Sequence, residues 1–132
     1  MKFAQSQIDE MIAHARDDLP NECCGVVGSA GGVAQVVHRA VNAAASPLRY
    51  EIDSKDFLRI YNLIDEADQD VGAIYHSHTR SAAYPSQTDI NLALWPEALY
   101  IIVSLAEADA PDVKAFAIVD RKVEEVALEI TA

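Results

Sequence analysis

The segment "YHSHTRSAAYPSQTD", residues 75–89, begins as a strand and ends as the start of a helix. Together with the preceding apolar run "VGAI", it predicts a buried strand over residues 71–78. Because alternate side chains of a strand point to the same face, His76 and His78 would project together and could offer ring nitrogens to one metal ion. A strand histidine is more often an ordinary hydrogen-bonded residue, so the pair by itself leaves both interpretations open.

Asp89 follows His78 by eleven residues and lies three residues after Ser86. If Ser86 caps a short helix predicted over "PSQTDINLALW", residues 85–95, the Asp89 carboxylate falls in its first turn. The S-x-x-D spacing is that of a capping box. The helix dipole stabilises a carboxylate at this position, so the pattern needs no metal. The same placement aims the carboxylate back toward the strand, so capping and metal ligation are compatible. Two histidines and one carboxylate leave a tetrahedral zinc with an open position for water, as a hydrolytic site requires.

A hydrolytic zinc site also needs a proton acceptor that is not a ligand. Candidates for this role are numerous in an acidic chain, and the position of Glu22 suggests it as one of them. It lies in "PNECCG", residues 20–25, immediately before a predicted buried strand. A carboxylate at the end of a sheet could face a neighbouring strand and have its pKa raised by partial burial. By position alone, a solvated loop acid remains the alternative. Neither H-E-x-x-H nor the deaminase pair of H-x-E and C-x-x-C occurs, which excludes two other zinc-hydrolase patterns.

The rest of the chain predicts interleaved helices and strands. Apolar residues at helical spacing predict a helix over residues 5–18, and Ser54 can cap a second helix that ends near Asp70. Residues 41–53 lack a clear period and should form a connecting loop. The predicted strands cover residues 23–29, 32–40, 71–78, 98–106, 113–120 and 122–130. Hairpins near both ends require antiparallel pairing, so the predicted class is α/β or α+β, with a mixed, curved sheet flanked by helices.

Composition and charge restrict the class of protein. The chain has 132 residues, a length typical of one domain, so we expect a single domain over residues 1–132. Its net charge of -11 repels phosphates and anionic lipid headgroups, which disfavours nucleic-acid and membrane binding. No apolar run reaches about eighteen residues, and Asp9 interrupts the N-terminal segment, so we expect a cytoplasmic protein.

The two cysteines of the chain, Cys23 and Cys24, are adjacent. A bridge between neighbours would be strained, which argues against a structural disulfide and fits a reducing compartment. On a strand the two side chains would point to opposite faces, which makes them poor joint ligands of one ion. Whether either cysteine has a redox role stays open.

Glu22 together with "HSHTRSAAYPSQTD", residues 76–89, resembles the motif of the JAMM (MPN-plus) metalloprotease family. That motif is a distant glutamate followed by H-x-H, seven residues, a serine, two residues and an aspartate, and the count matches at every place. The segment "PNECCGVVGS", residues 20–29, is similar to the family's sequence around its glutamate, and the element order is similar over essentially the whole chain. One departure is Thr79, where many relatives have proline. We expect it to change loop stiffness more than metal ligation.

The resemblance implies the JAMM/MPN fold, which is cytidine-deaminase-like, and a Zn2+ cofactor. By resemblance, His76, His78 and Asp89 bind the zinc ion. Glu22 takes the proton from the zinc-bound water and passes it to the leaving amine, and Ser86 helps to stabilise the tetrahedral oxyanion. The activity that the resemblance implies is hydrolysis of a peptide or isopeptide bond.

The short form of the chain is similar to prokaryotic relatives, among them peptidases that remove cysteine from the Gly-Gly tail of a ubiquitin-like sulfur-carrier protein. The resemblance therefore implies a ubiquitin-like or sulfur-carrier protein with a C-terminal Gly-Gly tail as the partner. A narrow groove could accept this extended tail by edge-strand pairing. The short chain leaves no room for the insertions with which eukaryotic deubiquitinases of the family hold a second ubiquitin.

Two other interpretations of the function stay open. The first is a non-catalytic MPN-type scaffold or interaction module, because the same fold also occurs as an interaction module in larger complexes. The second is a zinc amidase that acts on small amides or peptides without any carrier protein. The sequence also leaves open whether two copies form a homodimer.

Overall fold

A mixed β-sheet forms the centre of the fold. The computed structural model describes residues 1–131 of the chain, and within them it contains eight strands and three helices. The helices are α1 (Gln5–Asp17), α2 (Ser54–Glu66) and α3 (Gln87–Asn91). The strands are β1 (Lys2–Ala4), β2 (Cys24–Ala30), β3 (Val33–Ala40), β4 (Asp70–His78), β5 (Leu99–Ser104), β6 (Asp112–Val119), β7 (Lys122–Val126) and β8 (Glu129–Thr131).

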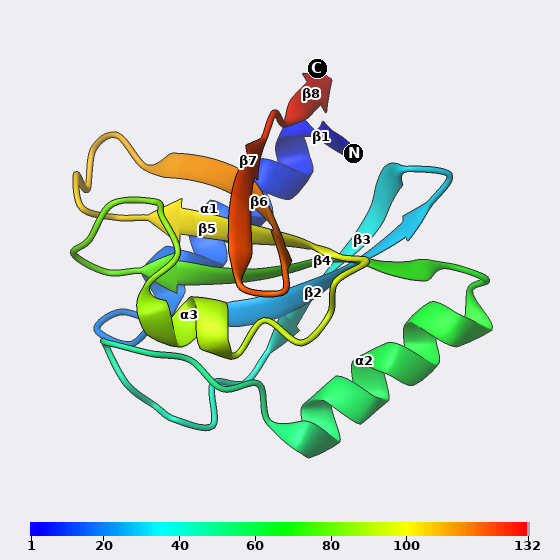
Figure 1. Ribbon diagram of the computed structural model, residues 1–132, viewed down its shortest axis with the longest axis horizontal. Coiled ribbons are helices and arrows are strands. Elements are labelled where there is room, and N and C mark those ends of the chain that lie inside the picture. Colours follow the sequence, from blue (N-terminus) through cyan, green and yellow to red (C-terminus); the bar gives the residue numbers. More distant parts are fainter. Residues whose placement is uncertain (132) are drawn as a thin grey trace.

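The strands follow the order β7-β6-β5-β4-β2-β3-β1-β8 across the sheet. β4 pairs in parallel with β5, and β1 pairs in parallel with β3 and β8, whereas the other neighbours are antiparallel. The first and last strands therefore lie side by side at one edge of the sheet, which curls strongly (Figure 1). α3 lies in the crossover that the parallel β4–β5 pair requires. The predicted mixed, curved sheet and both predicted hairpins are confirmed.

The two long helices cover opposite faces of the sheet (Figure 1). Ile8, Met11 and Ala15 recur at helical spacing on α1 and are buried against one face. Ile60 and Ile64 of α2 are buried against the other face. Full burial of a large aliphatic side chain contributes about 1.5–3 kcal/mol, so these side chains supply several kcal/mol toward holding each helix on its face.

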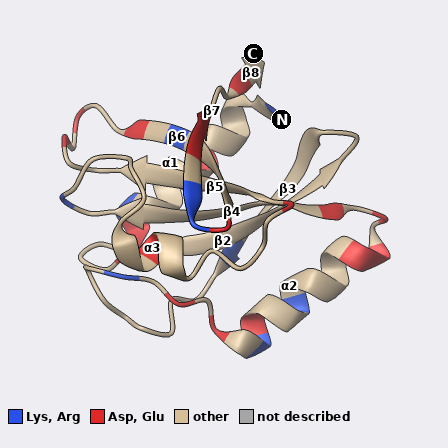
Figure 2. Ribbon diagram, viewed as in Figure 1, with Lys and Arg blue, Asp and Glu red and all other residues tan. Residues whose placement is uncertain are grey.

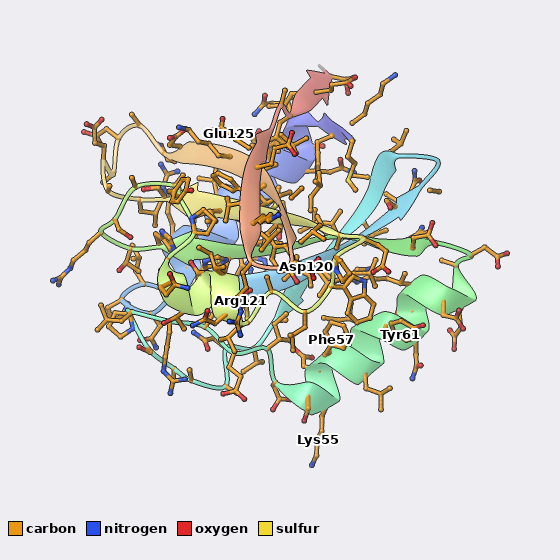
Figure 3. The ribbon with its side chains drawn as sticks, viewed as in Figure 1. Lys55, Phe57, Tyr61, Asp120, Arg121 and Glu125 are labelled. Atoms are coloured by element: carbon orange, nitrogen blue, oxygen red, sulfur yellow. The ribbon has the colours of Figure 1, made fainter. Side chains whose placement is uncertain are left out.

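The inner side of α2 also carries aromatic residues. Figure 3 shows Phe57 and Tyr61 projecting from α2 toward the sheet, whereas Lys55 points away from it. The centroid of the Trp95 ring lies 5.6 Å from that of Phe57 and 6.3 Å from that of Tyr61. Trp95 belongs to the segment between α3 and β5, so these contacts fix that segment against α2.

The predicted start and end of α2 need correction. The N-cap is Asp53, whose side chain accepts a backbone hydrogen bond from the first turn, and Ser54 is the first helical residue. The helix ends at Glu66 and does not reach Asp70, which begins β4. Asp68 ends the helical path, because it takes a left-handed φ of 55°.

Two further predicted elements also differ from the structure. α3 ends at Asn91, whereas the sequence predicts a helix over residues 85–95. The Trp95 backbone N–H instead donates to the Tyr100 hydroxyl at 2.9 Å, which holds the segment after α3 out of helical geometry. The predicted strand over residues 122–130 is two strands, because β8 leaves the hairpin to pair with β1. The sequence does not predict β1, since three residues carry no periodic signal.

Acidic residues are distributed over many elements (Figure 2). The net charge of -11 therefore comes from the whole surface and not from one acidic patch. Over residues 1–131, no helix is both long enough and apolar enough to cross a bilayer.

Gly25 of β2 lies against the ring of Tyr75 on β4, and a Cβ at this position would overlap that ring. Tyr75 is fully buried, and a 2.6 Å hydrogen bond joins its hydroxyl to His14 Nδ1, so the ring has little freedom to move aside. We expect Gly25→Ala to lower the free energy of unfolding by about 1–3 kcal/mol, the usual cost of overpacking. Urea unfolding followed by circular dichroism measures this change. The control Val36→Ala, exposed on β3, should change it by less than about 0.5 kcal/mol. An unchanged midpoint for Gly25→Ala would contradict the close packing.

Candidate metal centre

His76, His78 and Asp89 converge on one point at the face of the sheet that α2 covers. The two Nε2 atoms of the histidines are 3.2 Å apart, and Asp89 Oδ2 lies 3.1 Å from that of His76 and 2.9 Å from that of His78. All three residues are buried, with relative exposures of 1%, 4% and 5%. The structure thus brings together the three side chains that the sequence analysis selects as metal ligands.

A strand and a helix start each position part of this cluster. His76 and His78 share one face of β4, as the strand alternation predicts. Asp89 lies in the first turn of α3, where its N–H donates to Ser86 Oγ at 3.1 Å. The Ser86 N–H in turn donates to Asp89 Oδ2 at 2.9 Å. The same Oδ2 atom faces both histidine rings, so the capping box and the convergence on one point occur together.

A hydrogen bond fixes which nitrogen of His78 faces the cluster. The backbone oxygen of Ala82 can only accept, so His78 Nδ1, 2.8 Å away, carries the proton of the neutral ring. Nε2 then directs a lone pair at His76 Nε2 and Asp89 Oδ2, which lie within 3.2 Å of it. Three lone pairs this close repel one another unless a proton or a cation lies between them. The donor set of two imidazoles and one carboxylate fits Zn2+ with one position left open.

The surroundings shift the pKa values of the three residues in different directions. Burial acts to lower the pKa of His78, but its contacts with Asp89 and the Ala82 oxygen outweigh burial and raise it. Tyr50 stacks on the His76 ring, with a centroid distance of 4.2 Å and an interplanar angle of 19°. Burial lowers the pKa of His76, which keeps its ring neutral. Burial acts to raise the pKa of Asp89, but the two histidines, when protonated, and the Ser86 N–H stabilise the carboxylate and lower that pKa below the ordinary range. A neutral imidazole and an ionised carboxylate are the forms that ligate a cation.

Glu22 lies opposite His78 across the β2–β4 ladder. Cys24 pairs with His76 in antiparallel register, so the two numbers of each pair add up to 100 at this end of the ladder. If this register continues for two residues beyond the Cys24–His76 pair, residue 22 lies across from residue 78. Because residues two apart share a face, Glu22 is on the same side of the sheet as the two histidines.

The Glu22 side chain is buried and incompletely hydrogen-bonded. It is 4% exposed, and Oε1 has no hydrogen-bond partner in the part of the chain that the structure describes. Burial raises the pKa of Glu22 to about 7, with His78 opposing the rise and Asp89 adding to it. The structure therefore buries Glu22 and does not place it as a solvated loop acid. A carboxyl that titrates near neutral pH can both accept and release a proton.

The structure adds three residues to the site that the sequence does not predict. Ser77 Oγ accepts from the Cys23 N–H at 2.8 Å and ties the residue after Glu22 to β4. Tyr50 packs on a histidine of the cluster, and Asn42 Nδ2 donates to Glu22 O at 3.0 Å. Tyr50 and Asn42 lie in a segment without hydrophobic period, so no pattern selects them. The position of Ser77 between the two motif histidines is the signal that could have identified it.

Cys23 and Cys24 are buried in different core layers on opposite faces of the sheet. Both thiols are free, so the expected absence of a disulfide is confirmed for the described chain. Burial raises the pKa of Cys23 to about 12 and raises that of Cys24 as well. Neither residue supplies a thiolate near neutral pH, so neither is a nucleophile of this site.

Comparison with known proteins identifies the family. The family described as prokaryotic homologs of the JAB domain matches residues 4–119. The chain belongs to this family. The CysO-cysteine peptidase of Mycobacterium tuberculosis is 38% identical over 120 residues, covering 89% of this chain and 82% of that protein. The desampylase of Haloferax volcanii is 35% identical over 111 residues, covering 79% of this chain and 80% of that protein.

Solved structures agree with the assignment to the JAB family. The solution structure of DSY2949 from Desulfitobacterium hafniense has a TM-score of 0.89 at 32% identity and covers 98% of this chain and 92% of that one. More distant JAB1/MPN and JAMM structures at 20% identity share the fold, with TM-scores of 0.66 and 0.64. The family and the fold that the sequence motif implies are therefore confirmed.

We expect this JAB-family chain to bind one divalent ion per chain at the histidine–aspartate cluster. Titration of the metal-free protein with Zn2+, followed by calorimetry, measures the stoichiometry. At a free ion concentration 100-fold above Kd, the free energy of unfolding should rise by about 2.7 kcal/mol, and EDTA should reverse the gain. His78→Ala should remove the binding, whereas the control His38→Ala on β3 should keep it. Equal Zn2+ affinity in His78→Ala and the wild type would contradict the assignment of the ligands.

Proposed function

We propose that this chain is a zinc-dependent peptidase or isopeptidase that hydrolyses the bond after the Gly-Gly tail of a ubiquitin-like or sulfur-carrier protein. The observation that carries the proposal is the convergence of His76, His78 and Asp89 beside the buried carboxyl of Glu22. Three ligand atoms and an unbonded carboxyl oxygen in one buried place are costly to fold, and a scaffold has no need of them. The names of the two relatives, a peptidase and a desampylase, support a hydrolytic role.

In this proposal His76, His78 and Asp89 hold the zinc ion. When bound, the ion would lower the pKa of a coordinated water from about 15.7 toward 7. Glu22, with a pKa of about 7 in the chain alone, would accept a proton near neutral pH from the water whose oxygen bonds to the scissile carbonyl carbon. Its Oε1 atom has no partner among the described residues, so accepting the proton there breaks no hydrogen bond. The Glu22 carboxyl then donates the proton to the leaving amine as the scissile bond breaks.

Ser86 is proposed to stabilise the oxyanion that forms at the scissile carbonyl. Its Oγ accepts from the Asp89 N–H at 3.1 Å, and this acceptor role leaves the hydroxyl proton available as a donor. The N-cap position holds the hydroxyl beside the ligand carboxylate without a separate ordering step. A donor that is oriented before the reaction stabilises developing charge more than a mobile one does.

A glycine tail suits a site in which the reacting groups are buried. Glu22, His76, His78 and Asp89 are all at most 5% exposed, so the scissile bond has to enter on a thin, extended segment. Glycine has no side chain and passes through such an opening at the lowest steric cost. The relative named for CysO-cysteine supports a carrier whose C-terminal cysteine is released. We also propose that residues 1–132 form one domain and act in the cytoplasm, which the buried free thiols fit.

The activity of the proposed enzyme should depend on the ionised form of Glu22. Its pKa is about 7 in the chain alone, and a bound cation would lower it toward the ordinary 4.5. Because a protonated carboxyl cannot accept a proton, we expect kcat/KM to fall about tenfold per pH unit on an acid limb between these two values. Glu22→Gln should lose at least about 100-fold in kcat while keeping its zinc.

The control for Glu22→Gln is Glu107→Gln, which removes the same charge at an exposed position. It should keep wild-type activity and the same acid limb. Zinc content by atomic absorption shows whether each variant carries its ion. A fully metallated Glu22→Gln protein with wild-type activity would exclude Glu22 as the proton acceptor.

Incubation of the zinc-loaded protein with candidate carrier proteins that end in Gly-Gly-Cys tests the substrate. We expect the intact mass of the carrier to fall by one cysteine residue and free cysteine to appear. Addition of EDTA should abolish the reaction, and a matched Ala-Ala-Cys tail should react more slowly, because two methyl groups crowd the buried entrance.

Other outcomes of this experiment favour the two alternative functions. Stable capture of a carrier without cleavage, and without bound metal, would favour the scaffold. Equal rates on the carrier and on a short free peptide with the same tail would favour an amidase for small substrates.

A further inference from the structure

The side-chain amide of Asn42 closes the loop between β3 and α2. This loop, residues 42–52 (the Asn42 loop), has an antiparallel bridge at its base between Asn42 and Ile52. Asn42 is 9% exposed and makes four side-chain hydrogen bonds of 3.0–3.1 Å, to Glu22 O, Arg49 O, Ala44 N and Glu51 N. An amide offers two N–H donors and two acceptor lone pairs, so the hydrogen-bonding capacity of this side chain is filled.

The Asn42 loop contacts two residues of the proposed reaction. It holds both backbone polar groups of Glu22, because Asn42 Nδ2 donates to the Glu22 oxygen and the Glu22 N–H donates to Ser46 O at 2.9 Å. Near the other end of the loop, Tyr50 stacks on the ring of His76. A shift of the loop would therefore displace the proposed proton acceptor and one proposed ligand together.

A few other bonds also hold the loop, among them Ala43 N–H to Glu51 O at 2.7 Å and Thr79 Oγ1 to Pro47 O at 3.1 Å. Its middle is mostly exposed, with Leu48 at 83%. Ala45 takes a left-handed φ of 44°, and its N–H donates to the backbone oxygen of Asn42. Such a conformation of a non-glycine residue persists only where the surroundings hold it. Asn42 contacts residues near both ends of the loop and thus restrains the whole segment.

We propose that Asn42 is a positioning residue for the hydrolytic reaction, and that its side-chain N–H bond to the Glu22 backbone oxygen sets the place of Glu22 relative to the three ligands. This role rests on the function proposed above. Its specific content is that a donor matters: Oδ1 and one N–H of Nδ2 close the loop on itself through Ala44, Glu51 and Arg49, whereas the other N–H joins the loop to Glu22. Small misplacement of a reacting group has large effects on rate, because proton transfer requires hydrogen-bond distance.

The variant Asn42→Asp tests this role with minimal change of shape. Aspartate keeps the two acceptors for the Ala44 and Glu51 N–H groups but loses both donors and brings carboxylate oxygen toward two backbone oxygens. We expect kcat to fall about 10- to 100-fold, with KM and zinc content within about twofold of the wild type. Hydrogen exchange should become faster at the Glu22 amide, while the Ala44 and Glu51 amides stay protected.

Two control variants separate positioning from general effects. Asn62→Asp makes the same change at an exposed position of α2 and should leave kcat unchanged. Ile118→Val weakens the buried core on β6, far along the sheet from the loop, and should lower the melting temperature without lowering kcat. If Asn42→Asp and Ile118→Val lower the melting temperature equally, a purely structural role of Asn42 predicts the same kcat for both variants. A larger loss of kcat in Asn42→Asp supports positioning.

The possible results are decisive. Wild-type kcat in zinc-loaded Asn42→Asp would overturn the proposal, and so would failure of both Asn42→Asp and Asn42→Ala to fold, since Asn42 would then serve the fold as a whole. If the wild type itself hydrolyses no carrier, the proposed function fails. The role of Asn42 is then decided by exchange alone, and an unchanged rate at the Glu22 amide overturns it.

Discussion

The antiparallel pairing of β2 with β4 determines where Glu22 lies relative to the two histidines of the candidate site. Opposite Cys24 this ladder holds His76, and one alternation further it places Glu22 across from His78. Because strand side chains alternate between faces, a slip by one residue would send the carboxyl and the imidazoles to different sides of the sheet. The register is irregular only beyond Val27, at the far end of the ladder from the site. Regular pairing at the near end is thus what brings a distant glutamate to the histidine pair.

The same pairing concentrates ionisable groups where water is largely excluded, which affects stability as well as chemistry. The carboxylate of Asp89 is compensated locally, because it accepts from the Ser86 N–H and lies at a helix start. Glu22 lacks such compensation, and its folded pKa of about 7 lies above its unfolded value. The stability that its neutral form contributes is fully present below the unfolded pKa and is lost as the pH rises through about 7. A cation at the three ligands would offset part of that cost.

The sequence predicts the parts of the structure that local pattern determines. The spacing from His76 to Asp89 specifies the ligand cluster, and the helical period of residues 5–18 is confirmed as α1 to within one residue. The sequence does not predict the pairing of β1 with β8, because that contact joins two segments near the ends of the chain and neither strand exceeds three residues. The length of α3 is likewise decided by a tertiary contact, the bond from the Trp95 N–H to the Tyr100 hydroxyl.

The loops that complete the site illustrate why their residues escape prediction. Thr79 donates from Oγ1 to Pro47 O at 3.1 Å and so joins the loop after His78 to the Asn42 loop. A proline at this position would fix its own φ but would supply no such donor. The loop after His78 is therefore restrained by its hydrogen bond to the Asn42 loop and not by a fixed backbone angle of its own. Hydrogen bonds from Thr79 to the Asn42 loop and from Asn42 to Glu22 thus connect residues that lie far apart in the sequence, a connection that no spacing rule contains.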